Sequence, residues 1–200
     1  MNNYHYIISG LPCLSADFSP AQFSYEETVG HILPLLSERD RRAVAWIEQG
    51  FIPANLGHHF YRGASKCSIP FIRRWYEFDH NLRNAQVDYL SRKEGFDSER
   101  WTDGSFSTEF EDYPQMYRVF EMEDMMERER ALDRLRWEKV NELLAFHYFD
   151  IDVILGFVIK ARIVARWSEM DHEKGVRMFE ELVAEVRGTF KGVNYQDNNK

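Results

Sequence analysis

The segment between Pro70 and Gly95 constrains the fold more than any other part of the sequence. Its large apolar side chains recur at alternating spacings of four and three residues, which is the repeat of one helix face. Proline is favourable at the first position of a helix, and glycine is favourable just after the last one. The sequence therefore predicts one long packing helix, whose seam consists of Phe71, Trp75, Phe78, Leu82, Ala85 and Tyr89.

Two shorter helices are predicted before this segment. Ser24 and Glu27 form a capping box that begins a helix, which Pro34 should end or bend. Ser37 is placed to cap the next helix, because a serine hydroxyl accepts a hydrogen bond from the first turn. Gly50 stands where a left-handed residue after that helix is expected.

Further helices are predicted after Pro114. Residues 151–167 are apolar nearly all round until Lys160, so this helix should lie at the centre of a bundle, with Val158 in the core. Asp171 can cap a last helix, whose seam is Val176, Phe179, Val183, Val186 and Phe190.

Three segments lack a helical repeat. Residues 4–12 fit either a short strand or a tucked extended segment. Residues 50–69 are predicted to be a connecting loop, and residues 96–113 an acidic irregular insertion.

The fold class predicted from these patterns is an all-α helical bundle of about five to seven helices. With 11 glycines and 6 prolines in 200 residues, tight turns are few and long helices are favoured. We expect a single helical domain over residues 1–200, with the alternative of two helical halves, about 1–95 and 114–190, joined by residues 96–113.

Charge and composition exclude several classes of protein. The net charge is −8, although residues 39–93 alone carry ten basic and five acidic groups. A chain that is negative overall is repelled by phosphate backbones, so we predict no nucleic-acid binding.

The longest apolar run is seven residues, whereas a membrane span needs about 20. The start of the chain lacks the basic region of a secretory signal, and two cysteines without CxxC spacing fit a reducing compartment, so we expect a cytoplasmic protein.

No common nucleotide-binding, acyl-transfer or zinc-protease motif occurs in the sequence. The strongest alternative is a pair of Glu-x-x-His motifs, Glu77 with His80 and Glu169 with His172, because this spacing places two metal ligands on one helix face. Five of nine positions are identical between residues 72–80 and 164–172, which raises the alternatives of a duplication or a chance match. No motif supplies the bridging glutamates of a di-iron site, so we predict no metal, no cofactor and no catalytic residue.

Two predicted helices carry basic residues beside their apolar seams. A buried basic group is costly unless it is paired. One interpretation is internal pairing with Glu77, Asp79 or Asp152. The other is a docking surface for an acidic partner, for which the predicted residues are Arg73, Arg74, Arg83, Lys160, Arg162 and Arg166.

Four stretches of the sequence resemble a known family. They are YHYIISGLPCLS, EFDHNLRNAQVDYLSRKEG, HYFDIDVILGFVIKARIVARW and MFEELVAEVRGTF. Together they are similar to a bacterial family of uncharacterised proteins associated with V-type ATP synthases. Members of that family stand in for the C-type subunit of these enzymes, which is also called the d-type subunit.

The resemblance implies a non-catalytic coupling subunit of a V-type rotary ATP synthase. Such a subunit is a helical socket on the cytoplasmic face of the membrane, seated on the proteolipid ring and receiving the central rotor shaft. Its partners would be those two components, and it would be peripheral to the membrane through them. The alternative function is a helical metal- or small-ligand-binding enzyme that uses the Glu-x-x-His pair.

Overall fold

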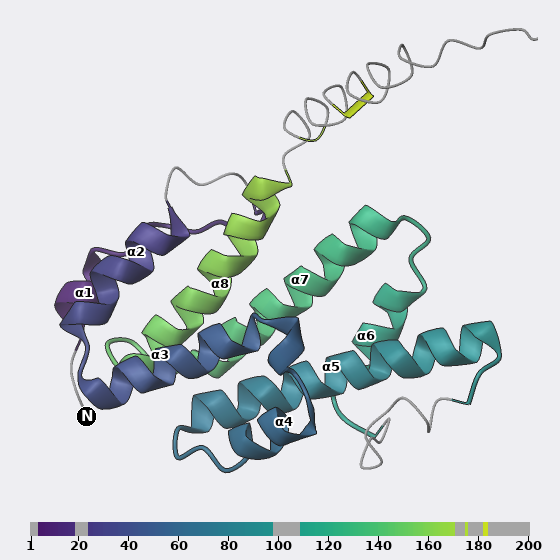
Figure 1. Ribbon diagram of the computed structural model, residues 1–200, viewed down its shortest axis with the longest axis horizontal. Helices are drawn as coiled ribbons and strands as arrows, with labels where there is room; N and C mark the ends of the chain where they lie inside the picture. The colour runs from purple at the N-terminus through teal and green to yellow at the C-terminus, as the bar shows by residue number, and fades with distance from the viewer. Residues whose placement is uncertain (1–3, 19–23, 98–108, 171–174, 176–181, 184–200) are drawn as a thin grey trace, which may run out of the picture.

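The computed structural model describes residues 4–18, 24–97, 109–170, 175 and 182–183, and every regular element within them is a helix (Figure 1). The elements are α1 (His5–Ser9), α2 (Tyr25–Ile32), η1 (Leu33–Leu35), α3 (Glu38–Gly50), η2 (Pro53–Asn55), α4 (His58–Ala64), α5 (Pro70–Glu94), α6 (Tyr113–Phe120), α7 (Met125–Leu143) and α8 (Ile151–Glu169), where η denotes a 3-10 helix. The predicted all-α bundle is confirmed.

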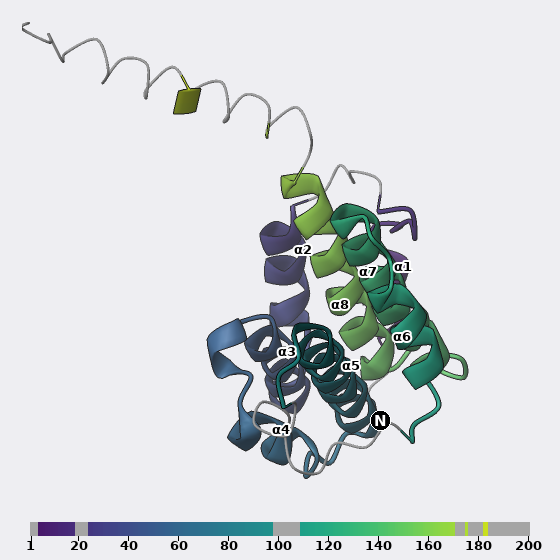
Figure 2. The ribbon, with the colours of Figure 1, turned by 90° about the vertical axis from the view of Figure 1, so that its right-hand side faces the viewer.

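Two helices, α5 and α8, organise the packing of the bundle. Helix α8 packs against α2, α3 and α7, while α5 packs against α3, α4, α6 and α7 (Figures 1 and 2). Helices α3 and α7 therefore join the two. None of the described helices combines the length with the apolar character that crossing a bilayer requires.

The long helix α5 is as the sequence predicts. Pro70 is its first residue, and Gly95 follows its last residue in the left-handed conformation, with φ of 75°. The Gly95 amide donates a hydrogen bond to the carbonyl of Arg92, which satisfies one of the open carbonyls at the helix end. The predicted seam faces the core from Phe71 to Ala85, and Tyr89 is partly buried against it.

The central position predicted for residues 151–167 is also confirmed. Val158 has 0% of its surface exposed, and every residue from Ile154 to Ile159 is buried. Gly156 marks the closest approach to α7, because a Cβ added there would lie 2.9 Å from Val140 Cγ1 and 2.6 Å from Leu144 Cδ1. The absence of a side chain at Gly156 lets the two helices pack together at this point.

The predicted helix starts in the first quarter of the chain are correct. The Ser24 hydroxyl accepts a hydrogen bond from the Glu27 amide at 3.2 Å, and the Ser37 hydroxyl accepts one from the Asp40 amide at 3.2 Å. Helix α2 ends at Ile32, and Pro34 lies in the 3-10 turn that follows.

Two segments without a helical repeat nevertheless contain short helices, which raises the number of α-helices above the five to seven expected. Residues 4–12, predicted to be extended, include α1, whose start is tied to the α7–α8 loop by a hydrogen bond from the Tyr4 amide to the Phe149 carbonyl at 2.7 Å. Residues 50–69, predicted to be a loop, include η2 and α4. Helix α4 buries Ala64 and packs on α5, so tertiary contacts override weak local signals.

The prediction of a left-handed Gly50 is wrong. Gly50 is the last residue of α3, and the residue after it has φ of −80°. Tyr76 explains the glycine, because its hydroxyl lies where a Cβ on Gly50 would be. That hydroxyl donates to the carbonyl of Trp46 at 2.8 Å, so close approach of α5 to the end of α3 requires the missing side chain.

The helical region after Pro114 is divided into α6 and α7. Asp124 begins the second helix, because its carboxylate accepts a hydrogen bond from the Glu127 amide at 2.8 Å. Most of the predicted acidic insertion and most of the predicted last helix, including Asp171, Val176, Phe179, Val186 and Phe190, lie outside the described residues.

Candidate functional site

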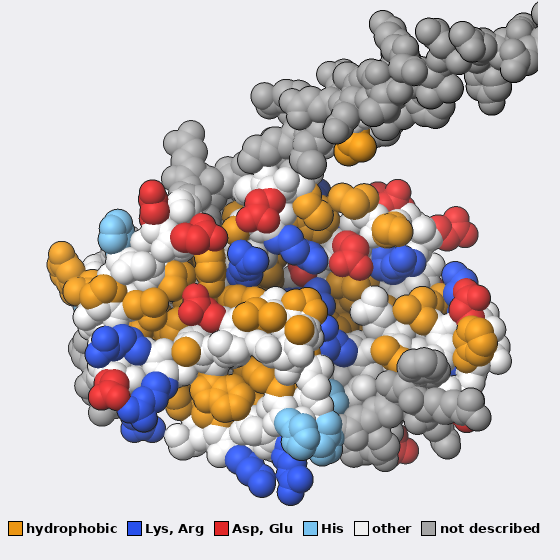
Figure 3. Space-filling model, viewed as in Figure 1, with side chains coloured by type: hydrophobic (Ala, Val, Ile, Leu, Met, Phe, Trp, Pro, Cys, Tyr) orange, Lys and Arg blue, Asp and Glu red, His pale blue; other side chains and the backbone are white. Residues whose placement is uncertain are grey.

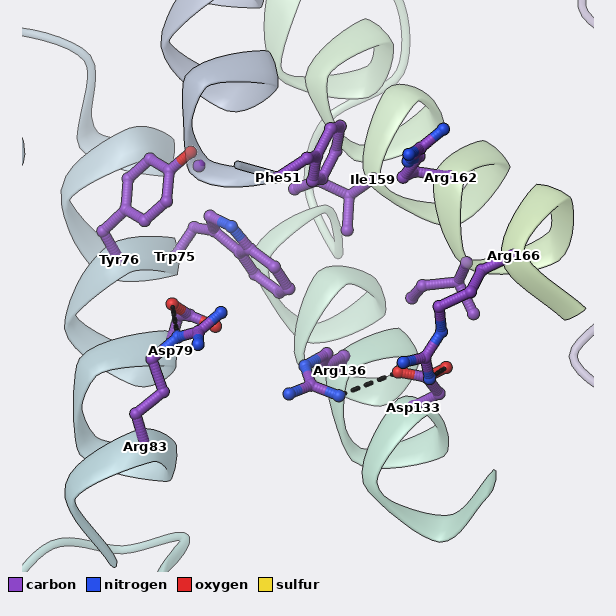
Figure 4. A pocket seen from close by; sticks show the side chains of 12 residues that line it. Phe51, Trp75, Tyr76, Asp79, Arg83, Asp133, Arg136, Ile159, Arg162 and Arg166 are labelled. Atoms are coloured by element: carbon purple, nitrogen blue, oxygen red, sulfur yellow. Dashed lines mark hydrogen bonds and ion pairs between the residues drawn. The ribbon is translucent and has the colours of Figure 1, made fainter. Parts of the chain in front are cut away.

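A pocket of about 220 Å³ opens between the end of α3 and helices α5, α7 and α8 (Figure 4). We call it the arginine pocket, because its charged lining consists of Asp79, Arg83, Asp133, Arg136, Arg162 and Arg166. Its other side chains are mainly apolar and aromatic: Phe51, Trp75, Tyr76, Ile159 and Ile163. In Figure 3, lysine and arginine side chains gather along the hollow in the middle of the visible face.

On the α5 side of the pocket, Asp79 holds Arg83. The Arg83 Nε donates to Asp79 Oδ2 at 2.8 Å, and the Tyr61 hydroxyl donates to the same oxygen at 2.8 Å. Burial disfavours the charged guanidinium, but attraction to Asp79 raises the pKa of Arg83 above its ordinary value. Burial, together with the charge of Asp79, raises the pKa of the Tyr61 hydroxyl, which therefore stays a donor.

On the opposite side, Asp133 of α7 binds two arginines. Its carboxylate accepts a hydrogen bond from Arg136 Nη1 at 2.8 Å, one from Arg166 of α8, and one from Trp167 Nε1 at 2.8 Å. Asp133 is only 2% exposed, so these three donors replace the water that it loses. Arg166 also lies 3.8 Å from Glu129 at the edge of the pocket.

Arg162 differs from the other three arginines. Its guanidinium lies 5.4 Å from the centre of the Tyr25 ring, which is a cation–π contact. Among the described residues, no carboxylate lies within ion-pair distance of Arg162, although Arg162 interacts electrostatically with Glu48 over a longer distance. The pKa of Glu48 is raised by burial, an effect that Arg162 partly opposes.

The lining of the arginine pocket therefore carries four positive and two negative charges, a net charge of +2. Guanidinium groups are planar, permanently charged and rich in donors, which suits them to carboxylate and phosphate oxygens. Half-buried charges are also screened less than surface charges. The arrangement can bind an anion.

The structure brings together three of the six residues predicted to bind a partner. Arg83, Arg162 and Arg166 line the arginine pocket. For Arg83 and Arg166 the predicted internal pairing is also present, with Asp79 as one of the partners that the sequence suggested.

The other three predicted residues lie elsewhere. Arg73 donates to the carbonyl of Cys67 at 2.6 Å, and Arg74 is exposed on α5. Lys160 donates to the side chain of Asn141 at 2.6 Å and lies over the ring of Trp137. Burial lowers the pKa of Lys160.

Sequence reasoning missed Asp133 and Arg136. A signal was present, because Asp133 directly follows Leu132, and Leu135 and Val140 continue the same buried face. An acidic residue beside an apolar stripe indicates a buried carboxylate that needs cationic partners. The charge-rich stretch around it hid this signal, since most of its acids and bases are exposed.

One group of described residues has the composition of a metal site: His147, Asp150 and Asp152. His147 Nδ1 lies 2.6 Å from Asp150 Oδ2 and 3.5 Å from Asp152 Oδ2. Asp150 is also the cap of α8, because it accepts a hydrogen bond from the Asp152 amide at 3.1 Å. Burial raises the pKa of Asp152. Helix starts favour acidic groups, which accounts for Asp150 and Asp152 at this position.

The predicted Glu-x-x-His pair has no part in that cluster. Glu77 is exposed on α5, and the ring of His80 stacks on Tyr61 with centroids 4.3 Å apart. Glu169 is exposed at the end of α8, and His172 lies outside the described residues. The alternative of an enzyme built on these motifs stays a prediction.

Comparison with known proteins gives one partial match. A family model described as "Protein of unknown function (DUF2764)" matches residues 102–189, which is less than half of the chain. The matched range contains Asp133, Arg136, Arg162 and Arg166 of the pocket, whereas Asp79 and Arg83 precede it. No curated protein and no solved structure matches.

Proposed function

We propose that this protein is a non-catalytic docking subunit whose arginine pocket receives an acidic group of a protein partner. The observation that carries the proposal is that four arginines from three helices line one pocket, whose lining has a net charge of +2. Charge of this kind steers association and fixes the register of a complex.

The size and the chemistry of the pocket fit the docking of one acidic group. At about 220 Å³ the pocket is smaller than the roughly 300–1,000 Å³ that is usual for drug-sized molecules and cofactors. It has room for one side chain or a group of similar size. Its guanidinium groups hold their protons at all ordinary pH values, so they supply fixed charge rather than proton transfer.

The partner proposed here comes from the sequence resemblance. In a V-type rotary ATP synthase the protein would link the central rotor shaft to the membrane proteolipid ring. It would then be held at the cytoplasmic face of the membrane by these protein partners. The acidic group would come from whichever of the two components faces α5, α7 and α8.

Reconstitution with the shaft subunits and the proteolipid ring tests this proposal. We expect the wild-type protein to co-elute with at least one component at low salt and less at high salt, because screened charge steers less effectively. Arg162→Glu should abolish most of the binding. The matched control is Arg134→Glu, which makes the same charge change at an exposed position of α7 outside the pocket.

Three results distinguish the parts of the proposal. Failure of the wild-type protein to bind either component rejects the rotary ATP synthase as the partner. Equal binding by wild type and Arg162→Glu rejects the arginine pocket as the docking site. Equal loss in Arg162→Glu and Arg134→Glu indicates overall charge rather than the pocket.

A further inference from the structure

We propose that the arginine pocket is also a binding site for a phosphate group, either free phosphate or the phosphate of a small ester. That this anion would compete with the acidic group of a partner rests on the proposed function. The binding itself does not.

Charge is the first argument. The lining carries +2, and a phosphate monoester carries about −1.5 to −2 at neutral pH. A single carboxylate would leave a positive charge uncompensated in a half-buried site. Two glutamates lie near the pocket but are not part of its lining: Glu129, which is 3.8 Å from Arg166, and Glu48, which interacts electrostatically with Arg162. They weaken the positive potential at the edge of the pocket without entering it.

The arrangement of donors is the second argument. A guanidinium group has five N–H donors. Arg83 uses Nε for Asp79, and Arg136 uses Nη1 for Asp133, while Arg162 has no described carboxylate as a partner. Arg83, Arg136 and Arg166 belong to α5, α7 and α8, so their donors come from separate helices. In the view of Figure 4, Arg136 lies between the other two. Oxygens that point in several directions, as in phosphate, suit such donors better than the two coplanar oxygens of a carboxylate.

Size and the apolar lining are the third argument. One water occupies about 30 Å³ of liquid, so the pocket, at about 220 Å³, holds a phosphate with a small attached group. Trp75, Phe51 and Ile163 form an apolar surface beside the arginines. An ester with a flat apolar group can cover that surface while its phosphate contacts the guanidinium groups.

Isothermal titration calorimetry on the full chain tests the site. The probes are inorganic phosphate, phenyl phosphate, sulfate and acetate at slightly alkaline pH. We expect phosphate and sulfate to bind, phenyl phosphate to bind more tightly than phosphate, and acetate to bind at least about tenfold more weakly. Tighter binding of phenyl phosphate would identify the natural ligand as a phosphate ester. Tighter binding of inorganic phosphate would identify it as free phosphate, and the phosphate site would be confirmed in either case.

The variants are Arg162→Met, which removes the arginine that has no described carboxylate partner, and Arg134→Met as the exposed control. Arg162→Met should weaken phosphate binding about tenfold, the loss of one charge-assisted contact. Arg162→Lys should restore part of it, because the charge returns without the planar fork. Thermal unfolding of each variant checks that the fold is intact.

Several results would overturn the inference. They are no binding of phosphate or sulfate by the wild-type protein, equal affinity for acetate, and an unchanged affinity in Arg162→Met. Equal affinity for acetate would leave the proposed docking of an acidic group standing. Phosphate binding that leaves co-elution with the ATP synthase components unchanged would confirm the site and reject the competition.

Discussion

The two halves of α8 show how one helix can serve the fold and a site. From Ile154 to Ala161 nearly every side chain is buried among apolar neighbours, and Gly156 brings the helix close to α7. From Arg162 to Arg166 the same helix contributes two arginines to the lining of the arginine pocket. The first half lowers the free energy of folding through apolar burial, whereas half-buried ion pairs add little to stability. Apolar burial therefore explains the first half, whereas it does not explain the two arginines of the second half.

The largest effect is expected from Val158→Asp in the apolar half of α8. The change places a carboxylate without a partner at a position that is 0% exposed, which costs several kcal/mol and removes much of a typical domain's stability. Thermal unfolding followed by circular dichroism measures the effect. Met126→Asp, at an exposed position of α7, should change the midpoint little. A midpoint within one or two degrees of wild type for Val158→Asp would contradict the core assignment.

The second effect is expected from Asp133→Asn. This variant tests whether the ion pairs in the arginine pocket also stabilise the fold. The carboxylate is buried and accepts hydrogen bonds from Arg136, Arg166 and Trp167. Its neutralisation leaves two arginines without their shared counter-charge, so we expect a loss of about 3 kcal/mol in urea unfolding. Glu138→Gln, an exposed change on the same helix, should have no measurable effect. Equal stability of the two variants would show that the ion pairs around Asp133 do not support the fold.

The third effect concerns the close approach of α7 and α8. Gly156→Ala adds a methyl group within 2.9 Å of Val140 and 2.6 Å of Leu144, and forcing these side chains apart should cost about 1–3 kcal/mol. Gly30→Ala in α2 is the matched control, because nothing lies within 4 Å of the added carbon. That variant should gain up to about 1 kcal/mol from helix propensity. Unfolding curves of the two variants, measured under the same conditions, test this prediction. Stabilisation by both variants would mean that the helices are not in close contact at Gly156.

The sequence allowed prediction of the apolar half of α8 and of α5 because both depend on local, periodic signals. Pro70 and Gly95 set the start and the end of α5 through their own backbone conformations, and the apolar residues between them follow a single helical repeat. Gly50 shows the limit of such reasoning, since its conformation depends on Tyr76, which is distant in sequence. A glycine required for close packing and a glycine that ends a helix look alike in a sequence.

The arginine pocket could be predicted only in part, for a related reason. The basic residues of α5 and α8 are visible as interruptions of apolar seams, so Arg83, Arg162 and Arg166 could be selected individually. Which of them meet is set by how α5, α7 and α8 pack, and periodicity holds no information on that packing. Arg73 and Arg83 have the same charge and lie on the same helix, yet only Arg83 faces the pocket.

The smallest effect on stability is expected from Arg162→Met, and it separates the two halves of α8 most sharply. Removing Arg162 forfeits its contact with the Tyr25 ring, which is worth about 0.5–1 kcal/mol, but it also relieves repulsion from the other arginines and the cost of half-burying an uncompensated charge. The two contributions should cancel to within about 0.5 kcal/mol. Arg166→Met, by contrast, takes one of three donors from the buried Asp133 and should cost about 1–2 kcal/mol. Urea unfolding of the two variants side by side measures the difference. If Arg162→Met is the more destabilising of the two, this arginine serves the fold, and the assignment of the second half of α8 to a binding site loses its main support.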